Sequence, residues 1–596
     1  MKKLRSRIAL LFLLALCNTM SADAQSWQWA NGENCGGLVG GGLGDGWLCR
    51  TDIFNNVYTG GIFSGGNHGD SICFGGNKFY RPALSANIVL NKYDTSGNVL
   101  WTMVSGNGQA APYNITTDRS GNMYLFGYFW SDSLMFGNYL ITNPYYDAAI
   151  GENDYYNTSY FILKFDTAGN VVWHKTGGKV MPDGYSLSVG GISCDKFNNI
   201  YVCGSFSSSS IHIGADSLVN AHDSTSDIFL AKYDSSGNVL WTKEFGGIED
   251  DFGLGIAVSA DGSPIITGTF RSPSIAFGTS SLTYSVGSTT AYDAPDIFLT
   301  KLDSGGSVVW TRNSSGSGAP MAIAADLANN VYISGTIYDS TSFSVGSITF
   351  FNSYLSQSGY LAKYDAAGNV IWAKAYSPIS VGGGTQISIW GLTTDHCDHV
   401  WISGVMNGSS CYIDNTTIVY APSGYSNPTL LVGYTENGAL LYHDMIPNEE
   451  DDNSSLSSDA LGNIYLSDDV TGAAILDTSV AYWWGRSGEA MFTAKFRPAL
   501  ECYYYSDVEL TKKYVDNISL YPNPATTSLT ITSPDKITQI TITNLLGQTV
   551  YSSQFAVGSL PTGQAGLQAS IDVASFPAGM YFVRVNDTAV RKFVKS

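Results

Sequence analysis

Residues 227–242 read Asp227-Ile-Phe-Leu-Ala-Lys232-Tyr-Asp234-Ser-Ser-Gly237-Asn238-Val-Leu-Trp241-Thr242, and this stretch decides the fold. Hydrophobic residues alternate on both sides of a centre made of Asp, Ser, Gly and Asn, which favour turns. The pattern predicts two β-strands joined by a short turn. Further copies lie at residues 92–101, 164–173, 301–310 and 363–372, and a degraded copy runs from Gly433 to Tyr442.

The aromatic residue that ends each copy defines a period. These residues are Trp29, Trp101, Trp173, Trp241, Trp310, Trp372 and Tyr442, spaced 72, 72, 68, 69, 62 and 70 residues apart. A period of about 68 residues is long enough for four short strands with their loops, which is one blade of a β-propeller.

Two further signatures test this register. One is a turn followed by a strand that ends near Gly, as in Asn199-Ile-Tyr201 to Gly204, and the other is an apolar-Gly or apolar-Asp pair, as in Phe277-Gly278. Each signature occurs seven times. Because a single sheet cannot bury its apolar faces alone, neighbouring sheets must stack. The sequence therefore predicts an all-β, seven-bladed propeller.

The two ends of the repeat region each contain half of a blade joint. Ser26-Trp-Gln-Trp29 has the Trp strand without the Lys-Tyr-Asp strand that should precede it, and residues 490–496 have the preceding strand without its Trp strand. We therefore expect residues 27–30 to pair with residues 491–496, so that the N-terminal strand closes the last blade.

The chain ends differ in composition from the repeats. A basic start, an apolar run from Ile8 to Leu16 and Ala22-Asp-Ala24 predict a secretory signal peptide over residues 1–24. The propeller is expected over 25–497 and a linker over 498–516. Residues 517–596 contain short alternating strands, which predict a small Ig-like β-sandwich. No later segment has the length and apolarity of a membrane span.

Composition limits the partners. The 596-residue chain has 30 Lys and Arg against 50 Asp and Glu, for a net charge of −20, and only 13% of its residues are charged. An acidic chain of this kind argues against nucleic acid or an anionic membrane as a main partner. The 65 Gly and 37 Tyr fit a β protein with many turns.

The C-terminal segment carries four sequence blocks in order. They are Tyr521-Pro-Asn-Pro524-Ala, Ile540-Thr-Ile-Thr-Asn544-Leu-Leu-Gly547-Gln548, Phe576-Pro-Ala-Gly579-Met-Tyr581 and Arg591-Lys592-Phe-Val-Lys595. Residues 517–596 thus resemble the type A C-terminal sorting domain of type IX secretion. The residues that carry this resemblance are Tyr521, Pro522, Asn523, Pro524, Asn544, Gly547, Gln548, Gly579, Tyr581 and Lys592.

This resemblance implies a Bacteroidetes-type organism, Sec export, passage across the outer membrane by the type IX machinery, and removal of the domain near its junction with the linker. Residues 26–497 resemble the bacterial β-propeller repeat family (SBBP). That second resemblance implies a fold and says little about activity.

Several polar groups are candidate ligands. The Asp and Asn of the repeated turns, and the acidic runs at 249–251 and 449–452, offer oxygens to calcium, although turn capping and solvated loops explain them as well. His396-Cys-Asp-His399 is the only close group of histidines, and it falls where other repeats have a turn. Cys194 and Cys203 flank one tight turn, which predicts a local disulfide.

The recurrent Trp residues have two interpretations. They offer faces on which sugars stack, but one Trp per repeat at a fixed register is better explained by packing between blades. Tyr145-Tyr146, Tyr155-Tyr156 and Trp483-Trp484 lie outside the common pattern and are the better candidates for an exposed binding rim.

These observations favour a secreted or cell-surface binding or adhesion module whose partners are the type IX machinery and an extracellular glycan or protein. No catalytic site, resident metal or cofactor is assigned. The alternatives are an extracellular polysaccharide-acting enzyme with its site at the propeller channel, and a structural surface or matrix component.

Overall fold

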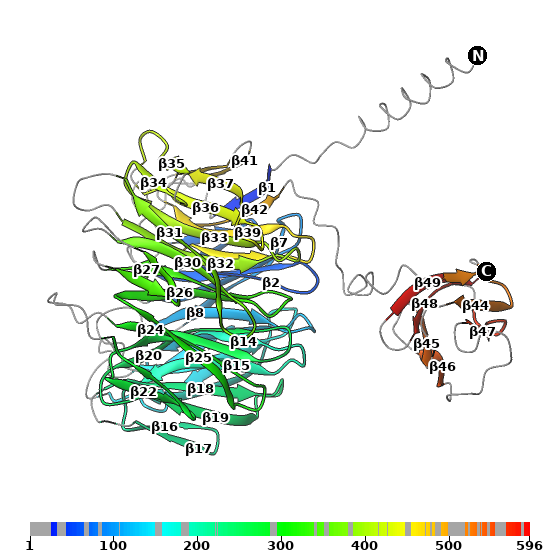
Figure 1. Cartoon of the computed structure of the whole chain (residues 1–596), viewed down its shortest axis with the longest axis horizontal. Coiled ribbons are helices and arrows are strands. Elements are labelled where there is room, and N and C mark those ends of the chain that lie inside the picture. Colours follow the sequence, from blue (N-terminus) through cyan, green and yellow to red (C-terminus); the bar gives the residue numbers. More distant parts are fainter. Residues whose placement is uncertain are drawn as a thin grey trace, which may run out of the picture. The chain divides into compact units, whose positions relative to one another are not determined.

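The computed structural model divides the chain into two compact units, Met1–Glu501 and Cys502–Ser596 (Figure 1). The structure describes residues 26–32, 43–64, 71–80, 86–106, 108–148, 158–179, 190–220, 222, 225–285, 295–338, 342–350, 357–379, 386–414, 417–425, 427–447, 454–470, 473–476, 479–482, 490–498, 519–522, 525–532, 537, 539–544, 549–554, 568–577, 579–585 and 589–595. The predicted signal peptide and residues 499–516 of the predicted linker lie outside these segments.

Residues 227–242 and the three that follow form β18 (Asp227–Tyr233) and β19 (Val239–Phe245), the two strands predicted for this stretch. They are the two outer strands of a four-stranded antiparallel sheet, whose other strands are β15 (Ile200–Phe206) and β14 (Ile192–Cys194). β15 and β18 are buried along their whole length. A strand buried on both faces needs another sheet on each side, which is the packing expected of stacked repeats.

Unit 1 repeats this four-stranded sheet. From the inner strand outward, the other sheets are β2 (Leu43–Thr51), β3 (Val57–Ser64), β6 (Asn87–Tyr93), β7 (Val99–Gly106); β8 (Ala110–Thr117), β9 (Met123–Phe129), β12 (Ser159–Phe165), β13 (Val171–Lys179); β20 (Asp251–Val258), β21 (Pro264–Phe270), β24 (Asp296–Leu302), β25 (Val308–Ser315); β26 (Gly318–Ala325), β27 (Val331–Ile337), β30 (Ser358–Tyr364), β31 (Val370–Pro378); β32 (Gln386–Thr394), β33 (Val400–Asn407), β36 (Thr429–Tyr434), β37 (Leu440–Ile446); and β38 (Ser455–Ser458), β39 (Ile464–Val470), β42 (Ala490–Arg497), β1 (Ser26–Gly32).

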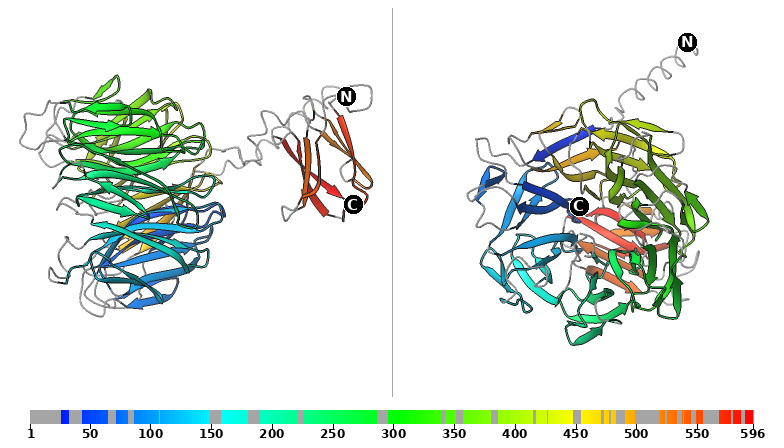
Figure 2. Two further views of the ribbon diagram at one scale, coloured as in Figure 1. Left: turned by 90° about the horizontal axis from the view of Figure 1, so that it is seen from below. Right: turned by 90° about the vertical axis from the view of Figure 1, so that its left-hand side faces the viewer.

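The inner strands contact one another in chain order. β2 contacts β8, and the contacts continue through β14, β20, β26, β32 and β38; β38 in turn contacts β2. In the right-hand view of Figure 2 the sheets of unit 1 follow one another around a common centre, from blue to yellow. This arrangement is that of a β-propeller repeat protein. Every element of the described residues is a strand, and none is a helix.

The N-terminal strand β1 is the outermost strand of the sheet that begins at β38. It pairs antiparallel with β42, and Trp27 lies opposite Phe496 and Ala30 opposite Ala494. This is the pairing expected from the two incomplete ends of the repeat region. The Trp27 ring is buried, with its centroid 5.2 Å from that of Phe496.

Each sheet also carries a short hairpin between its second and third strands, which the sequence analysis does not predict as strands. These hairpins are β4 (Ser71–Phe74) with β5 (Asn77–Tyr80), β10 (Ser133–Phe136) with β11 (Tyr139–Thr142), β16 (Ser210–Ile213) with β17 (Asp216–Val219), β22 (Ser274–Phe277) with β23 (Ser280–Thr283), β28 (Phe343–Val345) with β29 (Ile348–Phe350), β34 (Ser410–Tyr412) with β35 (Ile418–Tyr420), and β40 (Ala473–Leu476) with β41 (Ser479–Tyr482).

The apolar-Gly signature marks the turns of these hairpins. Gly75 has a φ of 56°, and a Cβ there would lie 2.7 Å from the Cβ of Val99, so only glycine fits without a shift. Three hairpins extend the sheet before their own: β10 pairs with β7, β28 with β25 and β34 with β31. The hairpins therefore tie neighbouring sheets together.

The predicted disulfide between Cys194 and Cys203 is wrong, because both thiols are free. Cys194 lies opposite Ile200 in the register of β14 and β15, and Cys203 is three residues further along β15. Successive side chains of a strand point to opposite faces, so the two sulfurs are on opposite faces of the sheet. Cys49 and Cys411 are also free, whereas Cys73 and Cys397 are disulfide-bonded.

Unit 2 has two antiparallel sheets around one core. The first contains β43 (Ser519–Tyr521), β44 (Ser528–Thr532) and β47 (Gln568–Asp572), and the second contains β46 (Thr549–Gln554), β45 (Gln539–Asn544), β48 (Gly579–Val585) and β49 (Ala589–Lys595). Leu529, Ile542 and Phe593 are completely buried in the core, to which both sheets contribute. The short strands predicted for this segment are present.

Candidate functional site

In four of the repeated hairpins, the Lys and the Trp both bond to the next sheet. Lys164 Nζ and Trp173 Nε1 both donate to the carbonyl oxygen of Ser235, at 2.8 and 3.2 Å. Ser235 lies in the turn that follows β18. Three other carbonyl oxygens accept from a Lys and a Trp in the same way. They are that of Thr167, which accepts from Lys92 and Trp101, that of Ser304, from Lys232 and Trp241, and that of Glu436, from Lys363 and Trp372.

The first and last sheets are joined in the same way. The carbonyl oxygen of Thr95, in the turn after β6, accepts from Trp29 Nε1 and from Lys495 Nζ, each at 3.1 Å. Trp29 belongs to β1 and Lys495 to β42. Two strands from opposite ends of the repeat region therefore supply the donors that elsewhere come from one hairpin.

The same Lys and Trp side chains pack around the Tyr of the second strand. In the second sheet, Lys164 Nζ lies 5.1 Å from the centroid of the Tyr124 ring, and the Trp173 ring lies 5.8 Å from it. Tyr124 itself is completely buried. The recurrent Trp residues are thus part of the joints between sheets, which confirms the packing interpretation over a sugar-stacking platform.

In six of the sheets, the turn between the first and second strands is organised by a buried carboxylate, and in the fourth sheet Ser259 stands at this position. In the second sheet, Asp118 Oδ1 accepts the backbone N–H groups of Ser120 and Asn122, and Oδ2 accepts from the side chains of Asn122 and Tyr124. Asp195, Asp326 and Asp459 make a closely similar set of bonds. These carboxylates are therefore capping groups. The Asp and Asn of the repeated hairpin turns cap in the same way, since Asp94 Oδ1 accepts the N–H groups of Ser96 and Asn98 and Oδ2 accepts from the Asn98 side chain. This is what the turn interpretation predicts.

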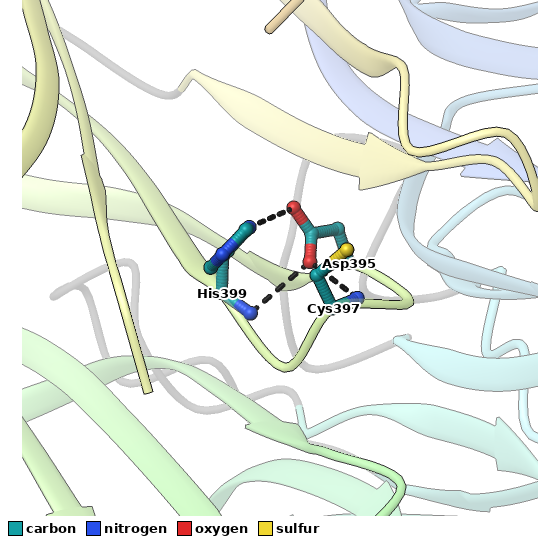
Figure 3. Close-up of side chains that lie close together, drawn as sticks. All are labelled: Asp395, Cys397 and His399. Atoms are coloured by element: carbon teal, nitrogen blue, oxygen red, sulfur yellow. Dashed lines mark hydrogen bonds and ion pairs between the residues drawn. The ribbon is translucent and has the colours of Figure 1, made fainter. Parts of the chain in front are cut away.

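The one group of potential metal ligands found among the described residues is a further copy of this turn. Asp395, Cys397 and His399 lie close together after β32 (Figure 3). Asp395 Oδ1 accepts the N–H groups of Cys397 and His399, and Oδ2 accepts from His399 Nδ1 at 3.0 Å and from Trp401 Nε1 at 3.1 Å. His399 and Trp401 stand where the other turns have Asn and Tyr.

This geometry favours the turn interpretation over a metal site. The Asp395 oxygens already accept four donors, and Cys397 is disulfide-bonded, so its sulfur is not a thiolate ligand. His396, the other histidine of the motif, is absent from the cluster.

The acidic run at 249–251 is also bound by neighbouring donors. Asp251 Oδ2 accepts from Ser272 Oγ at 2.8 Å, and Asp250 Oδ1 accepts from the N–H of Ser226 at 2.9 Å. Burial raises the pKa of Asp251 to about 6. These oxygens serve local loop contacts. The run at 449–452 lies outside the described residues.

A cavity of about 360 Å³ lies on the outer side of unit 1. Lys175 of β13, Asp216 of β17 and the turn at 237–240 line it. Asp216 Oδ2 accepts from Thr242 Oγ1 at 2.9 Å. The cavity is thus formed where one sheet, the next hairpin and the next turn meet.

The inner strands expose a different chemistry. Thr51, Thr117, Thr394 and Ser458 are partly exposed, and their hydroxyl groups donate to backbone carbonyls of neighbouring inner strands. Each inner strand except β14 and β38 also has a register shift in its pairing. Residues at these shifts whose side chains are described are partly exposed: Tyr113, Leu254, Met321 and Trp390.

One residue of the inner strands differs from these uncharged residues because it carries a positive charge. Arg50 of β2 is exposed, whereas the other charged residue among the described inner-strand side chains, Asp251, is buried. Arg50 belongs to no sequence motif; only the strand register aligns it with the other repeats.

The family model described as a secretion system C-terminal sorting domain matches residues 519–596. This segment is a type IX secretion sorting domain. It indicates export to the cell surface or the extracellular space. The described part of the chain has no apolar helix of membrane-spanning length.

The repeats have more distant relatives. The chain is 27% identical over 381 residues to an uncharacterized WD repeat-containing protein of Acanthamoeba polyphaga mimivirus, which is 55% of this chain and 26% of that protein. It is 30% identical over 123 residues to the regulatory protein FlaEY of Caulobacter vibrioides, which is 20% of this chain and 12% of that protein. The chain thus spans only about a quarter and an eighth of these relatives.

Solved structures resemble the chain weakly. The polysaccharide lyase Uly1 is 8% identical, with a TM-score of 0.39, and the match covers 80% of this chain and all of that one. PorZ of Porphyromonas gingivalis, a surface component of the type IX secretion system, is 11% identical with a TM-score of 0.17, over 92% of this chain and 81% of that one. Likenesses this weak carry no argument about function.

Within the sorting domain, the residues singled out by the sequence fall in different surroundings. Tyr521 of β43 is half exposed, whereas Tyr581 of β48 is buried, stacks on Phe593 and donates to the carbonyl of Pro577 at 2.8 Å. Asn544 ends β45 opposite Tyr581, and Gly579 lies opposite Lys595. Asn523, Pro524, Gly547 and Gln548 lie outside the described residues.

The equivalence of His399 with the Asn of the other turns predicts the effect of exchanging them. His399→Asn should change the free energy of unfolding by no more than about 0.5 kcal/mol, because Asn463 makes the same contact to its own Asp. Asp395→Ala, the matched control, should cost about 2–3 kcal/mol, because it leaves buried donors without an acceptor. Denaturant unfolding with and without added zinc measures both. A zinc-dependent stabilisation that His399→Asn abolishes would contradict the turn assignment.

Proposed function

We propose that this protein is a seven-bladed β-propeller, closed by its N-terminal strand, that type IX secretion exports and that acts outside the cell as a binding or adhesion module for a glycan or protein ligand. The observation that carries the proposal is that the two parts of the chain have different roles. The sorting domain provides for export, and the recurrent polar residues of the repeats are engaged in joints between sheets.

The closure is supported at three levels. The inner strand β38 contacts β2, and Thr51 of β2 donates its side-chain hydroxyl to the carbonyl of Ser458 in β38. In the turns, the N–H of Ala460 donates to Asn55 Oδ1, as the N–H of Arg119 does to Asn198 Oδ1 between the second and third sheets. On the outside, Trp29 and Lys495 share the Thr95 carbonyl.

A binding role is supported by the residues that depart from the repeat. The inner edge offers hydroxyl, aliphatic and aromatic side chains together with Arg50, a surface that suits recognition of a polar ligand with apolar faces. Tyr145 is partly exposed in the loop between β11 and β12. The other irregular aromatic pairs, at 155–156 and 483–484, lie outside the described residues.

The proposal includes four domain bounds: 1–24 for the signal peptide, 25–497 for the propeller, 498–516 for the linker and 517–596 for the sorting domain. It also includes the residues of the sorting domain that the secretion machinery would recognise. Tyr521 is half exposed, which supports a role in contacting the secretion machinery, whereas Tyr581 is buried in the core of the sorting domain. The remaining proposed recognition residues are Pro522, Asn523, Pro524, Asn544, Gly547, Gln548, Gly579 and Lys592.

Deletion of residues 517–596 tests the export route. We expect the shortened chain to accumulate in the periplasm, because it keeps the predicted signal peptide and loses the sorting domain. Cell fractionation followed by immunoblotting locates it, and full-length protein expressed at the same level is the control. Normal appearance of the shortened chain outside the cell would contradict the proposal.

A binding screen tests the molecular role. The exported chain is applied to arrays of glycans and extracellular proteins, and saturable binding to a defined ligand is expected. The same polysaccharides are then incubated with the protein and the products are separated by size. Time-dependent shortening of a polysaccharide would replace the binding proposal with the polysaccharide-acting enzyme, and no saturable binding at all would favour the structural component.

A further inference from the structure

Arg50 interrupts an otherwise uniform position of the repeat. It lies opposite Tyr58 in the pairing of β2 with β3. The residues that lie opposite the corresponding position of the second strand in the other sheets are all small: Thr116, Ser193, Ala257, Ala324, Thr393 and Ser457. A scaffold built from near-identical sheets therefore carries one long cationic side chain at one point of its inner edge.

The neighbours of Arg50 on the adjacent inner strands are small and buried. β2 lies between β8 and β38, whose equivalent residues Thr116 and Ser457 are only 1% and 2% exposed, while the Arg50 side chain is exposed. Ser457 Oγ accepts from the N–H of Thr51, so it is held in place by the backbone of β2 itself. Arg50 is therefore the exposed residue at this level of the three neighbouring inner strands.

The surroundings of Arg50 contain no compensating anion among the described residues. None of the ion pairs involves Arg50, although the chain has an excess of acidic groups. Its charge acts on the free thiol of Cys194 in β14, two sheets along the chain. Surrounding protein lowers the pKa of Arg50 below its usual value, even though water reaches its side chain. A guanidinium in such a place is partly dehydrated, and no described carboxylate forms an ion pair with it.

We propose that Arg50 anchors an oxyanion-binding site at the inner edge of the repeat region, and that it takes a carboxylate or sulfate group carried by a glycan ligand. The planar guanidinium presents paired N–H donors that match the oxygens of such groups, and it is less strongly hydrated than an ammonium. The partly exposed hydroxyl groups of neighbouring inner strands suit the sugar. This inference rests on the proposed binding function and assigns its ligand class.

The test compares two substitutions of Arg50 in the full mature chain. R50T introduces the residue that β8 and β32 carry at the same register, so the fold should tolerate it. R50K keeps the positive charge but loses the paired N–H donors of the guanidinium. The probes are trigalacturonate, neutral maltotriose and inorganic sulfate, titrated by calorimetry at matched ionic strength. We expect trigalacturonate to bind the wild type, R50T to raise its Kd about tenfold or more, and R50K to raise it by less.

The probes distinguish the sources of the oxyanion. Tighter binding of trigalacturonate than of sulfate supports a glycan substituent, whereas sulfate binding alone overturns the glycan assignment. Equal Kd values for trigalacturonate in the wild type and R50T overturn the site but leave the binding function standing. A fall in the unfolding midpoint of ligand-free R50T with an unchanged Kd would show a purely structural role and also overturn it.

Discussion

The fold of unit 1 depends on a turn carbonyl that accepts two donors from the preceding sheet. A four-stranded sheet with two apolar faces has no stable form alone, so its stacking on neighbours supplies most of the driving force. Apolar stacking is not directional, however, and permits one sheet to slide over another. The Lys ammonium and the Trp indole N–H meeting on one carbonyl, as at Ser235, set the register of each sheet on the next. The partly buried Lys has its charge placed over a Tyr ring, which offsets part of its desolvation.

Two sheets lack the usual pair of donors. The sixth has Gly433 and Tyr442 in place of the Lys and the Trp. The fourth shows what the joint requires. Lys301 pairs with Asp261 at 3.1 Å instead of a turn carbonyl. Trp310 still donates to the carbonyl of Ala366, and Arg312 adds a bond to the carbonyl of Gly368. The chemistry of the cation therefore varies while the bridge between sheets is kept. This tolerance explains how the repeats diverge in sequence and still stack.

The sequence predicts those parts of the fold that repeat, because six Trp residues and Tyr442 recur at nearly constant spacing and carry the same information. The pairing of β1 with β42 is predictable for the same reason, since each end lacks what the other has. The hairpin β10–β11 is not predicted as strands, because it is short and pairs with β7 of another sheet. The disulfide between Cys194 and Cys203 fails because proximity in sequence does not reveal which face of the sheet each sulfur occupies.

The candidate site is less predictable than the fold. His396-Cys-Asp-His399 attracts attention as a motif, yet the structure explains Asp395 and His399 by the same hydrogen bonds that Asp and Asn make in other turns. Arg50 cannot be singled out from the sequence, because a single Arg belongs to no motif. It stands out only when strand pairing aligns it with the small residues Thr116 and Ser457. In a repeat protein the residues that make function specific are those that differ between copies, and the register is needed to find them.

The central proposal is that β1, which pairs with β42, completes a closed ring as fully as any internal strand would. Comparing Trp29→Ala with Trp173→Ala tests it most directly, because the two indoles donate to turn carbonyls at 3.1 and 3.2 Å and pack on Tyr465 and Tyr124 at 6.0 and 5.8 Å. The free energy of unfolding should fall by a similar amount in both, about 3 kcal/mol. A loss for Trp173→Ala with almost none for Trp29→Ala would show that the ring does not depend on β1.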